Sequence, residues 1–388
     1  LNRDGVEDLI VFDRLSSRVL PFLKNEDSWM YAPEYSSIFP DVLDDWVLLR
    51  DFNGDGKKDI FVSTPLGMEV YVNTSNDDTF SWRLFHSREP GPSPLLTQGF
   101  TIAINLQLNA SDKPEIADLD GDGDLDILVF RFAGGSSVEY HRNYSIERDG
   151  NLDSLQMQRE TSAWGAFREC LCGTFAFDGE DCGPVPGRTF RPLHEGGKTL
   201  TVADLNGDGL PEAMVSEETC EELFYLENGG TIEEAYMTGL LPYLPDQTYP
   251  FFPASFLEDV NGDGLLDMML ASNWPSASEN LPETLPLLLN SGTTQLPEFN
   301  LTTDRFLIED MIDAGGLSHP AFMDLNGDGL TDMLLGHYAD QSGETPTSGL
   351  WYFENTGAVG APAFALQSKD YAPSIGEQGL YSIRPDFI

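Results

Sequence analysis

The stretch DFNGDGKKD, from Asp51 to Asp59, recurs along the chain and decides the fold. The other complete copies are DLDGDGDLD from Asp118, DLNGDGLPE from Asp204, DVNGDGLLD from Asp259 and DLNGDGLTD from Asp324. The chain opens on LNRDGVED, which is a sixth copy without its first residue. Successive complete copies start 67, 86, 55 and 65 residues apart. Repetition at this period is typical of architectures in which each unit stacks on its neighbours.

Strand-like segments surround every copy. A short apolar run follows each one, such as DIFVS or DMLLG, and an apolar stretch such as WVLLR or PAFM precedes each complete copy. An alternating segment that ends in Asn comes third, and its last residues are Asn25, Asn73, Asn143, Asn228, Asn290 and Asn355. Short runs bounded by turns predict strands. Each repeat is therefore expected to form about four strands.

Repeats of four strands predict an all-β fold, a β-propeller of four-stranded blades with a calcium-binding loop in each repeat. Six repeats are visible, so we expect six or seven blades in a single domain over residues 1–388. A parallel β-helix of calcium-binding nonapeptides is the rival architecture, but its period is far shorter.

The acidic loop has the donors that calcium prefers. Oxygen side chains occupy loop positions 1, 3, 5 and 9, position 7 can offer a backbone carbonyl, and the Gly at position 6 permits a sharp turn. An EF-hand or a dockerin would need a carboxylate at position 12. That position is apolar in every copy: Val11, Val62, Val129, Val215, Leu270 and Leu335. The alternative is a set of tight Asx turns without an ion.

The pattern resembles FG-GAP, or VCBS-type, repeats, as in integrin α-subunit propellers and many secreted bacterial proteins. The run LNRDGVEDLIVFDR, with YAPEY and WVLLRDFNGDGKKDIF, also resembles secreted proteins of the Bacteroidetes type. The resemblance implies about one Ca²⁺ per loop, between the first two strands of a blade. The implied side-chain ligands are Asp51, Asn53, Asp55 and Asp59; Asp118, Asp120, Asp122 and Asp126; Asp204, Asn206, Asp208 and Glu212; Asp259, Asn261, Asp263 and Asp267; Asp324, Asn326, Asp328 and Asp332. The incomplete first loop keeps Asn2, Asp4 and Asp8. Carbonyls of Val6, Lys57, Asp124, Leu210, Leu265 and Leu330 would complete the sites.

The charge excludes several classes of partner. The chain has 388 residues and a formal net charge of −44. Nucleic-acid binding needs clustered cations, and an anionic membrane surface would repel such a chain. No apolar run reaches the roughly 18 residues of a membrane span. An acidic, solvated surface is typical of soluble secreted proteins, so we expect an extracellular or cell-surface location.

The cysteines and sequons fit the same location. Cys170, Cys172, Cys182 and Cys220 are an even set, three of them in an insertion at about 146–198, and predict two disulfides. We prefer Cys172–Cys182 with Cys170–Cys220 among three connectivities, and zinc binding is the alternative. N-glycans are possible at Asn73, Asn109, Asn143 and Asn300.

No catalytic motif is visible in the sequence. The five His do not form a metal-spaced pair, and we interpret His319 and His337 as turn and strand-end residues. We expect a non-catalytic calcium-binding propeller that acts in adhesion, recognition or extracellular assembly. Its ligand would be a glycan, a protein or another copy of itself, and the aromatic segment YLPDQTYPFFPASF is the candidate surface. The alternative function is a polysaccharide lyase or hydrolase whose residues are scattered over the blades.

The two ends of the chain match one repeat. RPDFI at the C-terminus matches HPAFM before the sixth loop, and LNRDGVEDLI matches the loop that follows it. We expect the C-terminal strand at Pro385 to Ile388 to complete the first repeat within one ring, or a seventh blade to lie outside this sequence. A head-to-tail fibre, in which this strand joins the next molecule, is the other arrangement.

Overall fold

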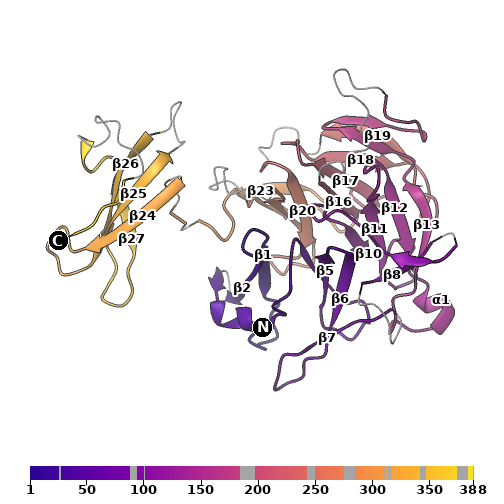
Figure 1. The fold of residues 1–388 in the computed structure, drawn as a ribbon, viewed down its shortest axis with the longest axis horizontal. Coiled ribbons are helices and arrows are strands. Elements are labelled where there is room, and N and C mark those ends of the chain that lie inside the picture. Colours follow the sequence, from indigo (N-terminus) through magenta and orange to yellow (C-terminus); the bar gives the residue numbers. More distant parts are fainter. Residues whose placement is uncertain are drawn as a thin grey trace. The chain divides into compact units, whose positions relative to one another are not determined.

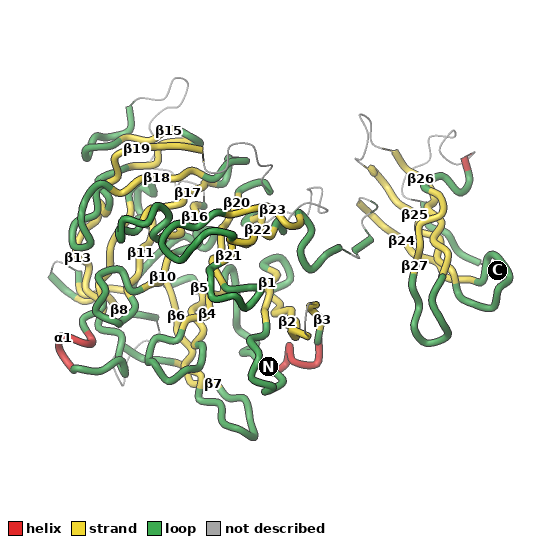
Figure 2. Tube along the Cα trace, turned by 180° about the vertical axis from the view of Figure 1, so that it is seen from behind, coloured by secondary structure: helices red, strands yellow, loops and turns green. Residues whose placement is uncertain are grey.

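The computed structural model shows an all-β chain (Figures 1 and 2). It describes residues 1–388 except 26–27, 88–93, 100, 184–196, 243–249, 275–284, 310, 313, 315, 341–346, 374–382 and 388. The chain divides into two compact units. The first comprises residues 1–277 and 284–307, and the second comprises residues 278–283 and 308–388. Each unit is described by itself.

Each repeat forms one sheet, in which the strands that follow one another around the loop pair antiparallel in chain order. The first sheet is β1(Leu9–Asp13), β2(Arg18–Asn25) and β3(Ser28–Tyr31), and the second is β4(Val47–Arg50), β5(Asp59–Thr64), β6(Gly67–Asn73) and β7(Trp82–Leu84). The third contains β10(Glu115–Ala117), β11(Asp126–Phe130), β12(Val138–Arg142) and β13(Met157–Trp164). The fourth is β16(Lys198–Ala203), β17(Glu212–Glu217), β18(Phe224–Asn228) and β19(Met237–Pro242), and the fifth is β20(Pro253–Glu258), β21(Asp267–Ser272), β22(Leu287–Asn290) and β23(Phe299–Thr303). The sixth, in the second unit, is β24(Gly316–Met323), β25(Asp332–Asp340), β26(Thr347–Asn355) and β27(Phe364–Ser368).

The prediction of about four strands per repeat is confirmed for the second, fourth, fifth and sixth sheets. The first sheet has three strands, β1, β2 and β3, which all follow the first loop. The third sheet has six, since the hairpin β8(Leu96–Gln98) and β9(Ala103–Asn105) joins it through parallel pairing of β8 with β13. The length between the second and third loops therefore contains an extra hairpin.

The second strand of each complete repeat is the most deeply buried. β5, β11 and β17 are apolar on both faces and nearly inaccessible, because neighbouring sheets cover each side. One apolar cluster includes Phe61 of the second sheet and Ile127 of the third. Similar clusters join the first sheet to the second, the third to the fourth, and the fourth to the fifth.

The first and fifth sheets are also neighbours within the first unit. Leu9 and Trp29 pack in one cluster with Val260, Leu287 and Phe306. The Trp29 and Phe306 rings meet edge to face, with centroids 6.3 Å apart. The first sheet thus shares apolar contacts with both the second and the fifth.

The C-terminal segment lies against the sixth sheet. Residues 383–387 are not part of a strand, and a Cβ added to Gly336 of β25 would meet the Ile383 carbonyl oxygen at 2.1 Å. Glycine is needed at this point, because the two backbones touch. Completion of the first repeat by this segment would involve both units, and it stays a prediction.

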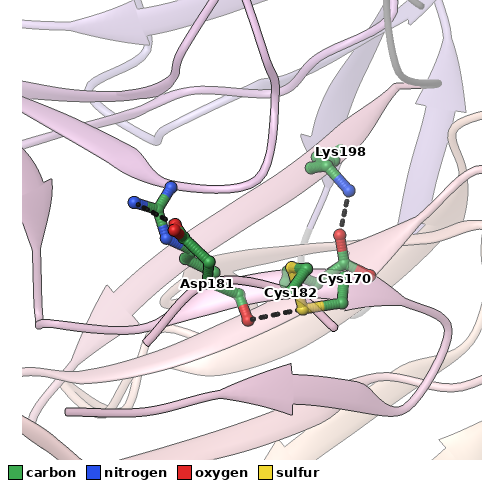
Figure 3. Close-up of a disulfide and its surroundings, with 6 residues drawn as sticks. Cys170, Asp181, Cys182 and Lys198 are labelled. Atoms are coloured by element: carbon green, nitrogen blue, oxygen red, sulfur yellow. Dashed lines mark hydrogen bonds and ion pairs between the residues drawn. A yellow bond between two sulfur atoms is a disulfide. The ribbon is translucent and has the colours of Figure 1, made fainter. Parts of the chain in front are cut away.

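The two predicted disulfides form, but the preferred pairing is wrong. The bonds are Cys170–Cys182, which Figure 3 shows, and Cys172–Cys220. They hold the hairpin β14(Arg168–Leu171) and β15(Thr174–Ala176), which follows β13. Cys172 lies in the turn, where its backbone N–H donates to the Glu217 carboxylate at 3.1 Å, and this places it beside the buried Cys220. All four cysteine sulfur atoms are thereby in disulfides, so no thiolate is left to bind zinc.

Helices are short in the described residues. The 3₁₀ helix is η1(Pro33–Ile38), and α1(Ser145–Asp149) lies between β12 and β13. Among the described residues, no helix is long and apolar enough to cross a membrane.

Candidate metal sites

The first Asp of each complete loop closes the loop around its own side chain. In the second loop the Gly54 N–H donates to Asp51 Oδ1 at 2.8 Å, and the Gly56 N–H donates to Asp51 Oδ2 at 2.8 Å. The same pair of bonds forms on Asp118, Asp204, Asp259 and Asp324. Both glycines have positive φ, 71° and 83°, which explains the strict glycine pattern at these two positions.

Positions 3 and 5 form consecutive Asx turns. The Asp55 N–H donates to Asn53 Oδ1 at 3.0 Å, and the Lys57 N–H donates to Asp55 Oδ1 at 2.9 Å. Each of these oxygens has two lone pairs, so accepting one N–H leaves it able to bind a cation. The loops therefore hold side-chain oxygens at positions 1, 3 and 5 in fixed orientations, where they could serve as metal ligands.

The ninth residue, called here the closing carboxylate, is the buried member of the set. In the five complete loops it is Asp59, Asp126, Glu212, Asp267 or Asp332, and each is 0% exposed. Its carboxylate accepts the backbone N–H of loop position 2 in every complete loop, from 2.8 Å at Leu205 to 3.3 Å at Leu119. The closing carboxylate therefore fastens the end of the loop to its start.

The same carboxylate also reaches the third strand. The backbone N–H of the strand-end Asn donates to it from Asn73, Asn143, Asn290 and Asn355, at 2.7–2.9 Å. We call these residues and Asn228 the anchor Asn. The anchor side chain is used as well: Asn290 Nδ2 donates to the Leu266 carbonyl at 3.2 Å, and its Oδ1 accepts the Gly292 and Glu298 N–H groups at 2.9 Å. One Asn thus joins the loop to the hairpin between the third and fourth strands.

The burial of several closing carboxylates has an electrostatic cost. Burial raises the pKa of Asp59 to about 6, that of Glu212 to about 7 and that of Asp126 to about 8. Neighbouring loop carboxylates contribute in the same direction. At Asp332 the effect of burial is outweighed by the hydrogen bonds that the carboxylate accepts, and its pKa is lowered. A cation near these groups would favour their ionised form, so the donor set fits a bound cation.

The third loop brings three of its carboxylates close together. Oxygen atoms of Asp118, Asp120 and Asp122 lie within 4.8 Å of one another. Oxygens of Asp122, Asp124 and Glu147 form a second group of this kind. All donors in and around the loop are oxygens, which suits calcium better than zinc. The predicted ligands of this loop at positions 1, 3 and 5 are therefore brought together.

The first loop is less regular. Asn2 Nδ2 donates to Asp4 Oδ2 at 2.8 Å, and Asp8 contacts the Leu1 amino group. The backbone donor from β2 to Asp8 is Lys24, at 3.1 Å, instead of the predicted anchor Asn25, which is exposed. The closing carboxylate is retained, but the anchor of this repeat is shifted by one residue.

The sequence did not identify Arg142 and Glu147 as part of the third loop's surroundings. Arg142 Nη2 lies 2.6 Å from Asp120 Oδ2 and 3.4 Å from Asp122 Oδ2, and it also contacts Glu147. A signal was present, because Arg142 directly precedes the anchor Asn143, but no sequence argument connected that position with the loop.

The structure also places the predicted glycan acceptors and part of the aromatic segment. The expectation of an exposed glycan acceptor is wrong for Asn143, which is 1% exposed because its side chain serves as the anchor. Asn73 Nδ2 donates to the Lys58 carbonyl, whereas Asn300 is exposed. Residues 243–249 of the aromatic segment lie outside the described residues. In the described part, residues 250–256, the Phe251 ring packs against Trp274 and Phe252 is buried.

Comparison with known proteins bears on the repeats. Residues 51–129 and 259–335 match the FG-GAP-like repeat family. Each matched segment begins at one loop and ends in the strand after the next loop, so the two segments contain four of the six loops. Comparison with curated proteins finds no match.

Two similar solved structures share 17% identity with this chain. One is described as an Agrocybe aegerita lectin that recognises non-reducing terminal N-acetylglucosamine; the match has a TM-score of 0.35 and covers 98% of this chain and 80% of that chain. The other is a Photorhabdus luminescens Tc holotoxin pore, with a TM-score of 0.34, and covers 91% of this chain and 13% of that chain. The family match and the repeated antiparallel sheets together lead to one conclusion: the chain contains FG-GAP-like repeats, at residues 51–129 and 259–335.

Proposed function

We propose that this protein is an extracellular, non-catalytic β-propeller module whose loops each bind one Ca²⁺. The observation that carries the proposal is the closing carboxylate. In five repeats a fully buried acidic group ends a loop of oxygen donors, and in four of them it is bonded to the third strand by the anchor Asn. A divalent cation would stabilise this buried negative charge.

The chain's own residues prepare the site. The Asp at position 1 folds the loop through its two glycine N–H bonds, and positions 3 and 5 orient their oxygens through Asx turns. The closing carboxylate fixes the loop to the sheet. Bound calcium would supply the positive charge that lets these carboxylates stay ionised and close together. Binding of the metal is therefore expected to stabilise each sheet and its packing on the next.

A propeller arrangement is supported by the packing of the first unit. Consecutive sheets share apolar clusters, and the first sheet packs on the fifth. Two disulfides and a net charge of −44 support an extracellular setting. We therefore propose a role in adhesion, recognition or extracellular assembly, with a glycan, a protein or another copy of the chain as the partner.

Binding arrays test this function. Fluorescently labelled protein is applied to glycan and protein arrays in millimolar calcium and in EDTA. The proposal expects binding that EDTA abolishes, with the array ligand recovered unchanged. Release of a shorter saccharide from any polysaccharide, lost on replacing one carboxylate outside the loops, would instead establish the alternative of a polysaccharide-processing enzyme.

A further inference from the structure

Arg142 places a fixed positive charge at the third loop. It is the last residue of β12, and its side chain is 30% exposed. Its Nη2 atom lies 2.6 Å from Asp120, at loop position 3, and 3.4 Å from Asp122, at position 5. The guanidinium also lies over the Tyr144 ring, at 4.9 Å from its centroid, so an aromatic contact helps to hold it at the loop.

The third loop is also the one with the extra negative charge at position 3. Asp120 occupies this position, whereas the other complete loops have Asn53, Asn206, Asn261 and Asn326. Asp124 adds a carboxylate at position 7, where the other complete loops have Lys or Leu. The start of α1 partly compensates the charge of Asp124, since Asp124 Oδ2 accepts the Ser145 and Ile146 N–H groups. Arg142 compensates the charge of Asp120 at position 3 through an ion pair.

The sixth loop contains the same contact with the opposite polarity. Glu354 directly precedes the anchor Asn355, as Arg142 precedes Asn143. Asn326 Nδ2, at loop position 3, donates to Glu354 Oε1 at 3.1 Å. Position 3 therefore contacts the residue before the anchor in both loops: Asp120 faces a cation, and Asn326 faces an anion. The two loops differ in the charge that surrounds a bound ion.

We propose that Arg142 is a built-in counter-cation of the third loop, which holds its carboxylates together without metal and makes its calcium affinity lower than that of the sixth loop. This inference rests on the proposed calcium function. A positive charge a few ångströms from the ion opposes its binding, and it remains effective because Arg is always protonated. Even at high effective dielectric, its removal is expected to tighten calcium binding at the third loop roughly tenfold.

Site-resolved hydrogen exchange tests the inference. Calcium is titrated into the full chain, and amide protection is followed for peptides that cover residues 118–126 and 324–332. In the wild-type protein the third loop should become protected at a higher calcium concentration than the sixth. Arg142→Gln should lower the midpoint of the third loop roughly tenfold and leave that of the sixth loop unchanged.

Arg148→Gln is the matched control, because it removes the same charge six residues away. Arg148 donates to Gln158 Oε1 at 2.8 Å and is exposed, so both midpoints should stay at the wild-type value. If Arg142→Gln does not fold, Arg142→Leu takes its place, because Leu289 precedes the anchor Asn290 in the fifth repeat, and the midpoint of the third loop should again fall roughly tenfold.

The possible outcomes separate the two proposals. An unchanged or higher midpoint in Arg142→Gln would overturn the role of Arg142 while leaving calcium binding intact. Absence of calcium-dependent protection at every complete loop of the wild-type protein would contradict the proposed function itself.

Discussion

The Asn73 backbone N–H donates a 2.7 Å hydrogen bond to the Asp59 carboxylate, which ties the end of β6 to the end of the second loop. Asp59 is fully buried, and its other oxygen accepts the Phe52 N–H at the start of the same loop. The loop is therefore an integral part of the sheet. Substitutions in the loop should therefore change the stability of the sheet.

The anchor Asn should contribute strongly to stability. Asn290→Ala removes the partners of the Gly292 and Glu298 N–H groups and of the Leu266 carbonyl. Polar groups left unpaired cost up to about 1–3 kcal/mol each, and these three are only partly buried, so we expect the free energy of unfolding to fall by roughly 2–4 kcal/mol. Urea denaturation measures this change. Asn300→Ala, at an exposed position of the same sheet, is the control and should change it by less than about 1 kcal/mol. Equal effects of the two substitutions would argue against the anchor role.

Substitution of two glycines in the fourth loop should destabilise the protein by different amounts, although the two residues have nearly the same backbone φ. Gly207 and Gly209 have φ of 83° and 84°, so Ala at either position pays a similar left-handed penalty of about 1–2 kcal/mol. A Cβ on Gly207 would also meet the Gln295 carbonyl oxygen at 2.4 Å, whereas a Cβ on Gly209 meets nothing within 4 Å. Gly207→Ala should therefore destabilise the protein by roughly 1–3 kcal/mol more than Gly209→Ala. The same loss in both variants would mean that this loop does not pack on the hairpin of the fifth sheet.

The two disulfides should contribute different amounts to the free energy of unfolding. Cys172–Cys220 closes a separation of 48 residues and Cys170–Cys182 one of 12. From the length of chain that each bond closes, replacing Cys172 and Cys220 by Ala should lower the free energy of unfolding by roughly 4 kcal/mol. Replacing Cys170 and Cys182 by Ala should lower it by roughly 3 kcal/mol. Thiol titration checks the pairing: Cys170→Ala with Cys182→Ala should leave no free thiol. Two free thiols in this variant would contradict the observed connectivity.

Asp112 should make stability depend on pH. It is buried, and burial raises its pKa to about 7, against about 3.9 in an unfolded chain. The folded state thus binds the proton more tightly, so this group's contribution is fully present below about pH 4 and is lost as the pH rises through about 7. Its oxygens accept the Lys198 and Asn109 N–H groups at 2.9 and 3.2 Å.

Asp112→Asn removes the titrating group and should flatten this part of the pH profile. Because the amide also disturbs one hydrogen bond, the slope is the informative quantity rather than the absolute stability. Denaturation of both proteins in saturating calcium, from pH 4.5 to 8, gives the difference directly. Parallel profiles would show that Asp112 does not titrate in this range.

The sequence predicted the repeated sheets and the position of every loop, because the glycine pattern and the apolar runs are local properties. It also found the anchor Asn as a recurring residue, but not its partners, since the bond from Asn143 to Asp126 joins residues 17 apart. The disulfide pairing depended on the turn that brings Cys172 to Cys220, which spacing does not show. Likewise, Arg142 meets Asp120 only once β12 pairs with β11.

Calcium stoichiometry tests the central claim most directly. The full chain is stripped with EDTA, exchanged into calcium of increasing concentration and weighed by native mass spectrometry, with the melting temperature recorded in parallel. We predict at least five Ca²⁺ per chain, one for each complete loop, and a melting temperature that rises with occupancy, since each site at 100 times its Kd contributes about 2.7 kcal/mol. A chain that takes up no calcium, and melts identically in EDTA and in millimolar calcium, would contradict the account.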